Sequence, residues 1–228
     1  MFAPFLQTIG LQITPSGTEN NFVAEALSIT PKEINLSDLY TYPVPQVSQS
    51  GGCDLKKSVA PEPYDLSPIC KINDEENKAD HPNTIRLWRL NQIIQSIEKR
   101  TQVDWIGIYR KAINTQDNLV LVKEAYHGEF SRAEFPLNED FAKNSNNSTV
   151  GLTQKAVVFQ DLGQYQGPYY KCDSKVRAEF CLPILDEEKN LLGIIDAEAW
   201  KTDFFTDENL LEISKIAHDL GQTDLLKI

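Results

Sequence analysis

The chain contains 228 residues, of which 41% are hydrophobic, and its 33 acidic residues outnumber its 22 basic residues to give a formal net charge of −11. This length allows one domain with an extension or two small domains, and a unit of about 150 residues buries enough surface to fold without disulfides or metals. The negative charge disfavours nucleic acids and anionic membranes as partners, and no apolar run is long enough to cross a bilayer.

The first segment, Met1 to Thr14, is mildly apolar but has neither a basic start nor a small-residue cleavage site. It therefore does not resemble a signal peptide. The cysteine spacings match no zinc motif. The four cysteines are Cys53, Cys70, Cys172 and Cys181. We expect a cytoplasmic protein with free thiols, no metal and no cofactor.

Composition shifts near His81. Residues 16–80 are rich in Pro, Ser, Asp and Glu, and prolines at this density break helices and central strands. This predicts an irregular, proline-rich N-terminal extension over 1–80, either loosely docked or disordered, before an ordered domain over 81–228. Five apolar residues near the start could pack on the core or on a second subunit: Phe2, Phe5, Leu6, Ile9 and Leu11.

The ordered part begins with a helix, because apolar residues recur at helical spacing from Leu87 to Ile97, with Asn83 or Thr84 as N-cap. A strand over 103–110 places Trp105, Gly107 and Tyr109 on one face. Further strands are expected over 118–126, 131–137 and 157–162. Residues 138–148 are expected to form a polar loop that ends in a short helix capped by Ser148 or Thr149.

Residues 177–185 and 191–200 form the clearest hairpin, separated by a polar turn. Thr206 should cap a final helix whose first turn carries Asp207 and Glu208, and whose buried stripe is Leu210, Ile213, Ala217 and Leu220. A helix, an antiparallel meander and a closing helix predict an α+β fold, with a central antiparallel sheet and flanking helices.

The hairpin carries polar groups where apolar ones are expected. Glu179 and Cys181 share one strand face because they are two residues apart, as do Asp196 and Glu198 on the next strand. If these faces coincide, three carboxylates and a thiol converge, and crowding should raise at least one carboxyl pKa. The alternative is that Asp196 or Glu198 lies solvated at a strand end.

Cys172 lies in the loop before this hairpin, between Lys171 and Asp173. A loop thiol can reach a ligand, and nearby lysines favour its thiolate form, although loop cysteines are commonly inert. Cys181, within an apolar strand, is most simply a small core residue. Trp105, Tyr109 and Tyr126 provide aromatic walls that core packing would explain equally well.

The order of these motifs resembles the free methionine-(R)-sulfoxide reductases, a GAF-domain family, over about residues 84–222. Trp105 to Tyr109 looks like that family's Trp-x-Gly-Phe-Tyr strand, and Tyr165 to Ser174 is similar to its Phe-Pro-Gly-His-x-x-Cys-Asp loop. Three further segments resemble the family's Ser-Glu-Ile-Val-x-Pro, Gly-Val-Leu-Asp-Ile-Asp and closing helix cap. They are Ala178–Pro183, Gly193–Glu198 and Phe205–Glu208.

The resemblance implies a GAF fold in which a thiolate attacks the sulfoxide sulfur and a carboxylic acid protonates the departing oxygen. Cys172 would be the attacking thiol, while Glu179, Asp196 and Glu198 would bind substrate and supply the proton. The implied substrate-binding residues are Trp105, Tyr109, Asp173 and Tyr126. It also implies thioredoxin as reducing partner and a homodimer.

This chain departs from the family at its other cysteines, one of which is replaced by Val150 and the other by a residue near Arg132. Cys181, Cys70 or an external thiol would then resolve the sulfenic acid. The alternative is a catalytically silent GAF domain that senses a small amino-acid-like ligand. Cyclic-nucleotide and tetrapyrrole binding fit an acidic pocket less well, and a plain interaction protein is the remaining alternative.

Overall fold

The computed structural model describes residues 2–15, 21–31, 34–46, 58–72, 78–168 and 173–228. Cys53 and Cys172 lie outside these ranges. Among the described residues, no helix combines the length and the apolar character that a membrane crossing requires.

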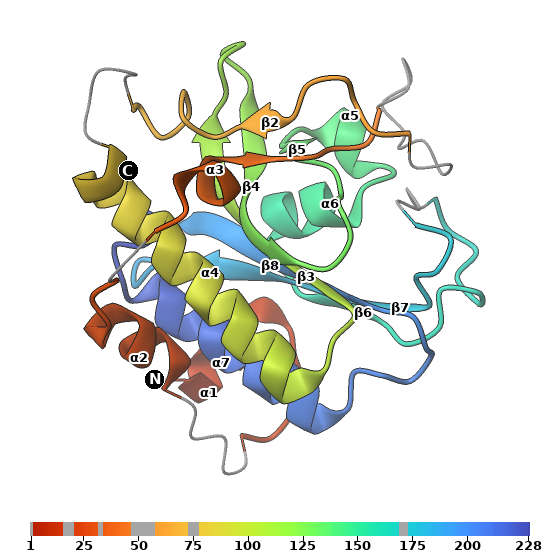
Figure 1. Cartoon of the computed structure of the whole chain (residues 1–228). Coiled ribbons are helices and arrows are strands. Elements are labelled where there is room, and N and C mark those ends of the chain that lie inside the picture. The colour runs from red at the N-terminus through yellow and green to blue at the C-terminus, as the bar shows by residue number, and fades with distance from the viewer. Residues whose placement is uncertain (1, 16–20, 32–33, 47–57, 73–77, 169–172) are drawn as a thin grey trace.

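A six-stranded antiparallel sheet forms the centre of the molecule, with strand order β5-β4-β3-β8-β7-β6 (Figure 1). The strands are β3 (Trp105–Ile113), β4 (Leu119–His127), β5 (Glu134–Pro136), β6 (Val157–Phe159), β7 (Ala178–Leu185) and β8 (Leu191–Ala199). This arrangement confirms the predicted α+β class with a central antiparallel sheet.

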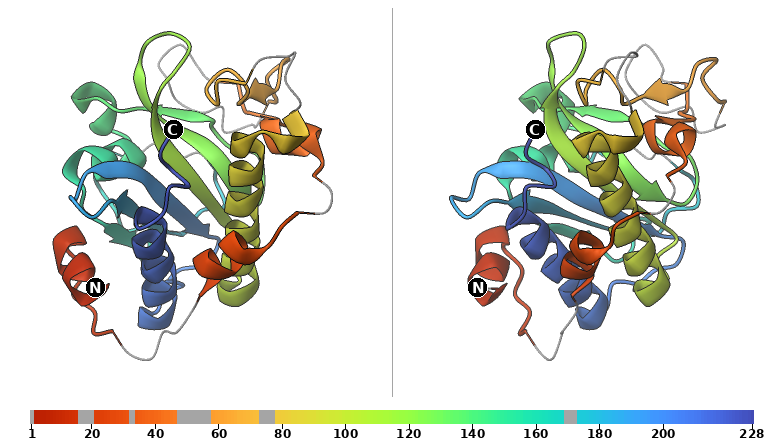
Figure 2. Two further views of the ribbon diagram at one scale, coloured as in Figure 1. Left: turned by 90° about the vertical axis from the view of Figure 1, so that its left-hand side faces the viewer. Right: turned by 60° about the vertical axis from the view of Figure 1, so that its left-hand side comes forward.

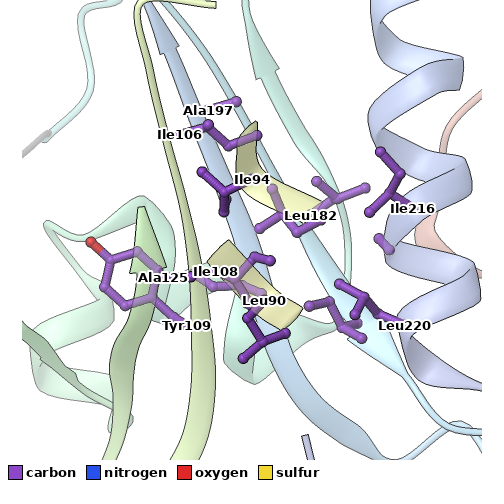
Figure 3. Packing of buried hydrophobic residues seen from close by; sticks show 14 of the residues in the cluster. Leu90, Ile94, Ile106, Ile108, Tyr109, Ala125, Leu182, Ala197, Ile216 and Leu220 are labelled. Atoms are coloured by element: carbon purple, nitrogen blue, oxygen red, sulfur yellow. The ribbon is translucent and has the colours of Figure 1, made fainter. Parts of the chain in front are cut away.

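Helices cover both faces of the sheet. The long helices α4 (Pro82–Thr101) and α7 (Asp207–Gly221) pack on one face, and the short helices α5 (Glu139–Ala142) and α6 (Asn146–Thr153) lie over the other (Figure 1). Leu90 and Ile94 of α4 and Ile216 of α7 meet Ile108 and Leu182 of the sheet (Figure 3). Because strand side chains alternate between faces, residues next to these core positions point toward α6.

Strand β8 approaches β3 so closely that only glycine fits at position 193. A Cβ atom there would lie 2.0 Å from the carbonyl oxygen of Tyr109. This close approach fixes the β3–β8 pairing, on which the placement of the acidic residues depends.

Helix caps account for two differences between the sequence prediction and the structure. His81, and not Asn83 or Thr84, caps α4, because its Nδ1 accepts the Asn83 amide and Pro82 occupies the first turn. The loop expected over 138–148 contains α5 and the start of α6, which Ser145 caps in place of Ser148 or Thr149. Thr206 caps α7 as predicted.

The described parts of the N-terminal extension are folded onto the rest of the chain. They form α1 (Phe2–Ile9), α2 (Phe22–Ser28), α3 (Leu36–Tyr40), β1 (Thr41–Tyr42), β2 (Tyr64–Asp65) and a 3-10 turn (Lys78–Asp80). Helix α1 lies against α7, and α2 against α4 and α7 (Figure 2).

Apolar side chains anchor this extension. Leu6 and Ile9 are buried on the chain's own core, although the sequence had also allowed a second subunit. His218 of α7 contacts the Phe2 and Phe5 rings of α1, and its Nδ1 atom lies 2.9 Å from Asp219 Oδ1. The expectation of loosely docked or disordered chain is therefore wrong for these segments.

A matched pair of leucine truncations tests whether the extension contributes to stability. Leu6 is 1% exposed in α1, whereas Leu27 is 37% exposed in α2. Leu6→Ala should lower the free energy of unfolding by about 2–4 kcal/mol, because it leaves a cavity under the helix. Leu27→Ala should change it by about 0.5 kcal/mol or less. Urea unfolding measures both, and equal values for the two variants would contradict a docked extension.

Candidate functional site

The register of three neighbouring strands brings the acidic residues together. Glu179 of β7 is paired with Glu198 of β8, which is paired on its other side with Trp105 of β3. Two pairs further along, and therefore on the same face, Cys181 lies opposite Asp196. Because directly opposed residues point to the same face of an antiparallel pair, these side chains share the sheet face that α6 covers.

Two adjacent amides of α6 hold two of the carboxylates. Asn146 donates from Nδ2 to Glu179 Oε1 at 2.5 Å, and Asn147 donates from Nδ2 to Asp196 Oδ2 at 2.8 Å. The sequence reasoning missed these asparagines. The signal was a pair of consecutive amides directly after the Ser145 cap, where a helix begins and presents its first-turn side chains to the sheet.

Asp196 is a buried acid with one oxygen held and the other free of described partners. Asp196 is only 4% exposed, and its Oδ1 atom has no hydrogen-bond partner among the described residues. Burial and the negative charge of Glu179 raise its pKa well above the ordinary aspartate value, and the hydrogen bond from Asn147 acts in the opposite direction. A carboxyl that keeps its proton near neutral pH can act as a proton donor.

Neither described thiol is placed to be a thiolate. Cys181 is fully buried, and burial together with the charges of Asp196, Glu179 and Glu198 raises its pKa well above the usual range. It shares the site face with the acids, as predicted. A thiol in this state is a poor nucleophile, since the thiolate is the reactive form.

Cys70, the other thiol suggested as a resolving group, lies on the opposite side of the sheet. Its sulfur is 3.7 Å from Arg86 Nη2 on α4, and burial together with the charge of Glu124 raises its pKa to about 11. The structure does not bring Cys70 to the acids. Cys172, the predicted attacking thiol, lies outside the described residues, and its neighbour Asp173 is buried, with Oδ1 accepting the Lys175 amide at 2.9 Å.

The predicted aromatic residues line or support the same region. Trp105 donates from Nε1 to the Glu129 carbonyl at 2.9 Å, and Tyr109 donates its hydroxyl to the Arg132 carbonyl at 3.3 Å. Tyr126 is half-buried and paired with Gly107. These contacts tether the loop over 128–132 to the strands beneath it.

Two cavities adjoin the acidic cluster. One of about 20 Å³ includes Trp105, Asp173 and Glu198, which is room for about one water. The other, of about 220 Å³, lies beside α6 and includes Asn146 and Phe159. No cluster of described residues could hold a metal ion. The arrangement therefore offers a proton donor, carboxylates for a cation and an aromatic wall.

Comparison with known proteins identifies the fold. A family model described as GAF domain matches residues 89–223. A search of curated protein sequences finds no match.

Similar solved structures include two reductases. The type II free methionine-R-sulfoxide reductase of Thermoplasma acidophilum is 20% identical, with a TM-score of 0.53 over 63% of this chain and 94% of that chain. The free methionine-R-sulfoxide reductase of Neisseria meningitidis, solved in complex with its substrate, is 18% identical, with a TM-score of 0.50 over 60% of this chain and 75% of that chain. At these identities the likeness establishes the fold.

The raised pKa of Asp196 predicts a specific pH dependence of stability. A raised folded-state pKa contributes stability that is complete below the unfolded pKa, near 3.8, and is lost as the pH rises through the folded value. Asp196→Asn has no carboxyl at this position, so it does not lose stability with rising pH in this way. The stability advantage of the variant over wild type should therefore grow as the pH rises from about 4 toward neutral.

Urea unfolding across this pH range measures the difference. Asp224→Asn is the matched control, because the Asp224 side chain is 92% exposed, and its difference from wild type should stay nearly flat. A wild type that gains stability over Asp196→Asn as the pH rises would show that the Asp196 carboxyl is ionised in the folded protein.

Proposed function

The chain belongs to the GAF-domain family, and on that premise we propose that its acidic sheet face binds free methionine-(R)-sulfoxide and reduces it to methionine. Cys172 is the attacking thiol in this proposal, and Asp196 is the proton donor. The observation that carries it is the buried Asp196 carboxyl, which combines a raised pKa with an oxygen free of described partners. A purely structural acid at this position would be expected to have both oxygens paired.

The proposed chemistry uses a thiol and an acid of this chain together with an external reductant. The Cys172 thiolate attacks the sulfoxide sulfur, the sulfur–oxygen bond of the substrate breaks, and the oxygen passes to Cys172 as a sulfenic acid, with the proton supplied by Asp196. Methionine leaves as the reduced product. One thiol of an external dithiol then condenses with the sulfenic acid to a mixed disulfide with release of water, and its second thiol attacks that disulfide, which releases the Cys172 thiolate and leaves the external dithiol oxidised. Asp196 regains its proton from solvent between turnovers.

The charges of the site suit a free amino acid. The ammonium group of such a substrate needs an anionic partner, which Glu179, Glu198 and Asp173 provide on neighbouring elements. Asn146 holds Glu179 in place, and Trp105 lies beside Glu198 on the adjacent strand. Two similar structures with TM-scores of at least 0.50 are free methionine-R-sulfoxide reductases, which supports the assignment.

The resolving step is the point at which this chain differs. Cys181 is a buried, protonated thiol, and Cys70 contacts Arg86 on the other side of the sheet. We therefore assign the reduction of the sulfenic acid to an external thiol, such as thioredoxin. The homodimer implied by the resemblance remains a proposal.

A second candidate function is ligand sensing without turnover. It is favoured by the absence of a lowered thiol pKa among the described cysteines, and by Val150 standing where the family has a cysteine. The same acids would then bind an amino-acid-like ligand without reacting with it.

Turnover of free methionine-(R)-sulfoxide with dithiothreitol distinguishes the two functions. Wild type should form methionine, Cys172→Ser should form none, and Asp196→Asn should lose about a hundred-fold or more of kcat, because it removes the general acid. Asp224→Asn is the exposed control and should retain wild-type rates. Thermal stabilisation by the sulfoxide without methionine formation would support the sensor and contradict the reductase.

Thiol variants test the external resolving step. Cys181→Ser and Cys70→Ser should each retain most of the thioredoxin-coupled rate of wild type, because neither thiol is placed to resolve the intermediate. The measurement is the initial rate with thioredoxin as sole reductant. A loss in either variant that dithiothreitol restores would instead identify that cysteine as the resolving thiol.

A further inference from the structure

Lys123 is a fully buried lysine on the site face of β4. A bulge in the β3–β4 pairing lies between Ile108 and Tyr109, so that Lys123 pairs with Tyr109 while Glu124 points to the opposite side and bonds Arg86 of α4. Because the side chains of consecutive strand residues point to opposite faces, Lys123 lies on the site face and Glu124 on the α4 face.

The Lys123 ammonium is enclosed by oxygens and aromatic rings. Its Nζ donates to the Ser131 carbonyl at 2.9 Å and to the Ser131 hydroxyl at 2.7 Å. It lies 4.1 Å from the ring centre of Tyr126, 4.8 Å from that of Tyr42 and 5.9 Å from that of Trp105. A desolvated cation over several aromatic faces is held by cation–π attraction as well as by hydrogen bonds.

One wall of this enclosure comes from the N-terminal extension. Tyr42 belongs to β1, and its hydroxyl donates to the Lys123 carbonyl at 2.6 Å. Its ring stacks on Tyr64 of β2 and meets Tyr126 edge-on, with 5.5 Å between centroids in both cases. The extension therefore reaches the backbone and the side chain of a residue on the site face.

The enclosure adjoins the candidate pocket. Ser131 and Trp105, which both contact the Lys123 ammonium, also line the small cavity with Asp173 and Glu198. Lys123 therefore lies one side chain behind the pocket wall. Packing alone does not account for the positive charge of Lys123. An apolar side chain of the same volume would fill this space without the desolvation cost of a buried ammonium.

We propose that Lys123 is a positioning residue of the pocket: its ammonium holds Ser131, and with it the loop over 128–132, against the acidic cluster, and Tyr42 of the extension completes its enclosure. The inference rests on the proposed function in that it concerns the same pocket. It predicts that the extension contributes to substrate affinity through Tyr42.

The experiment combines steady-state kinetics on free methionine-(R)-sulfoxide with hydrogen exchange of the full chain without ligand. Lys123→Met keeps the volume and removes the charge. It should raise KM about ten-fold, the loss expected for charge-assisted hydrogen bonds, and leave kcat within about two-fold, because the proposed proton donor Asp196 lies on β8 and does not depend on Lys123. Exchange of amides 128–132 should be faster than in wild type.

Two substitutions of Tyr42 form a matched pair of variants. Tyr42→Leu removes the ring and should raise KM in the same way, whereas Tyr42→Phe keeps the ring and should stay close to wild type. Tyr64→Phe is the control, because it keeps the stacked ring and alters only a bond to Glu134. If Lys123→Met does not fold, Tyr42→Leu and Ser131→Ala carry the test.

The two proposals fail in different ways. If wild type shows no turnover, the reductase assignment fails, and the loop exchange still decides the role of Lys123. Folded Lys123→Met with unchanged exchange at 128–132 would overturn the positioning role. So would an unchanged KM in an active protein, or a loss confined to kcat.

Discussion

The cost of burying negative charge on one face of an antiparallel sheet governs this structure. The pairing of β7, β8 and β3 places Glu179, Asp196 and Glu198 within two neighbouring cross-strand positions. So many carboxylates cannot all stay ionised away from water. The pKa of Asp196 is raised well above the ordinary aspartate value, which favours its uncharged form, and two amides of α6 turn toward the acids.

On the opposite face of the sheet, a buried carboxylate is stabilised by ion pairs. Glu124 is fully buried, but Arg86 and Arg110 bond its two oxygens at 2.5 and 2.7 Å. Burial alone would raise the pKa of Glu124, and the two guanidinium groups outweigh it and keep that pKa below the ordinary glutamate value. The paired guanidinium groups therefore favour the ionised form of Glu124. Asp196 has no cation of this kind bonded to it among the described residues, and its pKa is raised, which favours the uncharged form.

The N-terminal extension contacts both the long helices and the site face of the sheet. Its helices α1 and α2 cover outer surfaces of α7 and α4, and its strand residue Tyr42 reaches the site face through Lys123 (Figure 2). An antiparallel sheet with two long helices would leave the Lys123 ammonium without one of its aromatic walls. The extension therefore connects the stability of the fold to the geometry of the pocket.

The sequence by itself determined the main strands, the two long helices and the strand faces, because local periodicity is a property of neighbouring residues. The spacing of Glu179 and Cys181, and of Asp196 and Glu198, was sufficient to place each pair on one face, and Thr206 was sufficient to locate the start of α7. Only the tertiary structure decided which faces coincide, since that depends on register and on the close approach of β8 to β3 at Gly193. The tertiary structure also decided the roles of Asn147, Lys123 and Tyr42. Asp196 lies 49 residues from Asn147, and Lys123 lies 81 residues from Tyr42, and long-range contacts of this kind leave no periodic pattern in a single sequence. Ser131 is only 8 residues from Lys123, but the loop between them has no periodic pattern either.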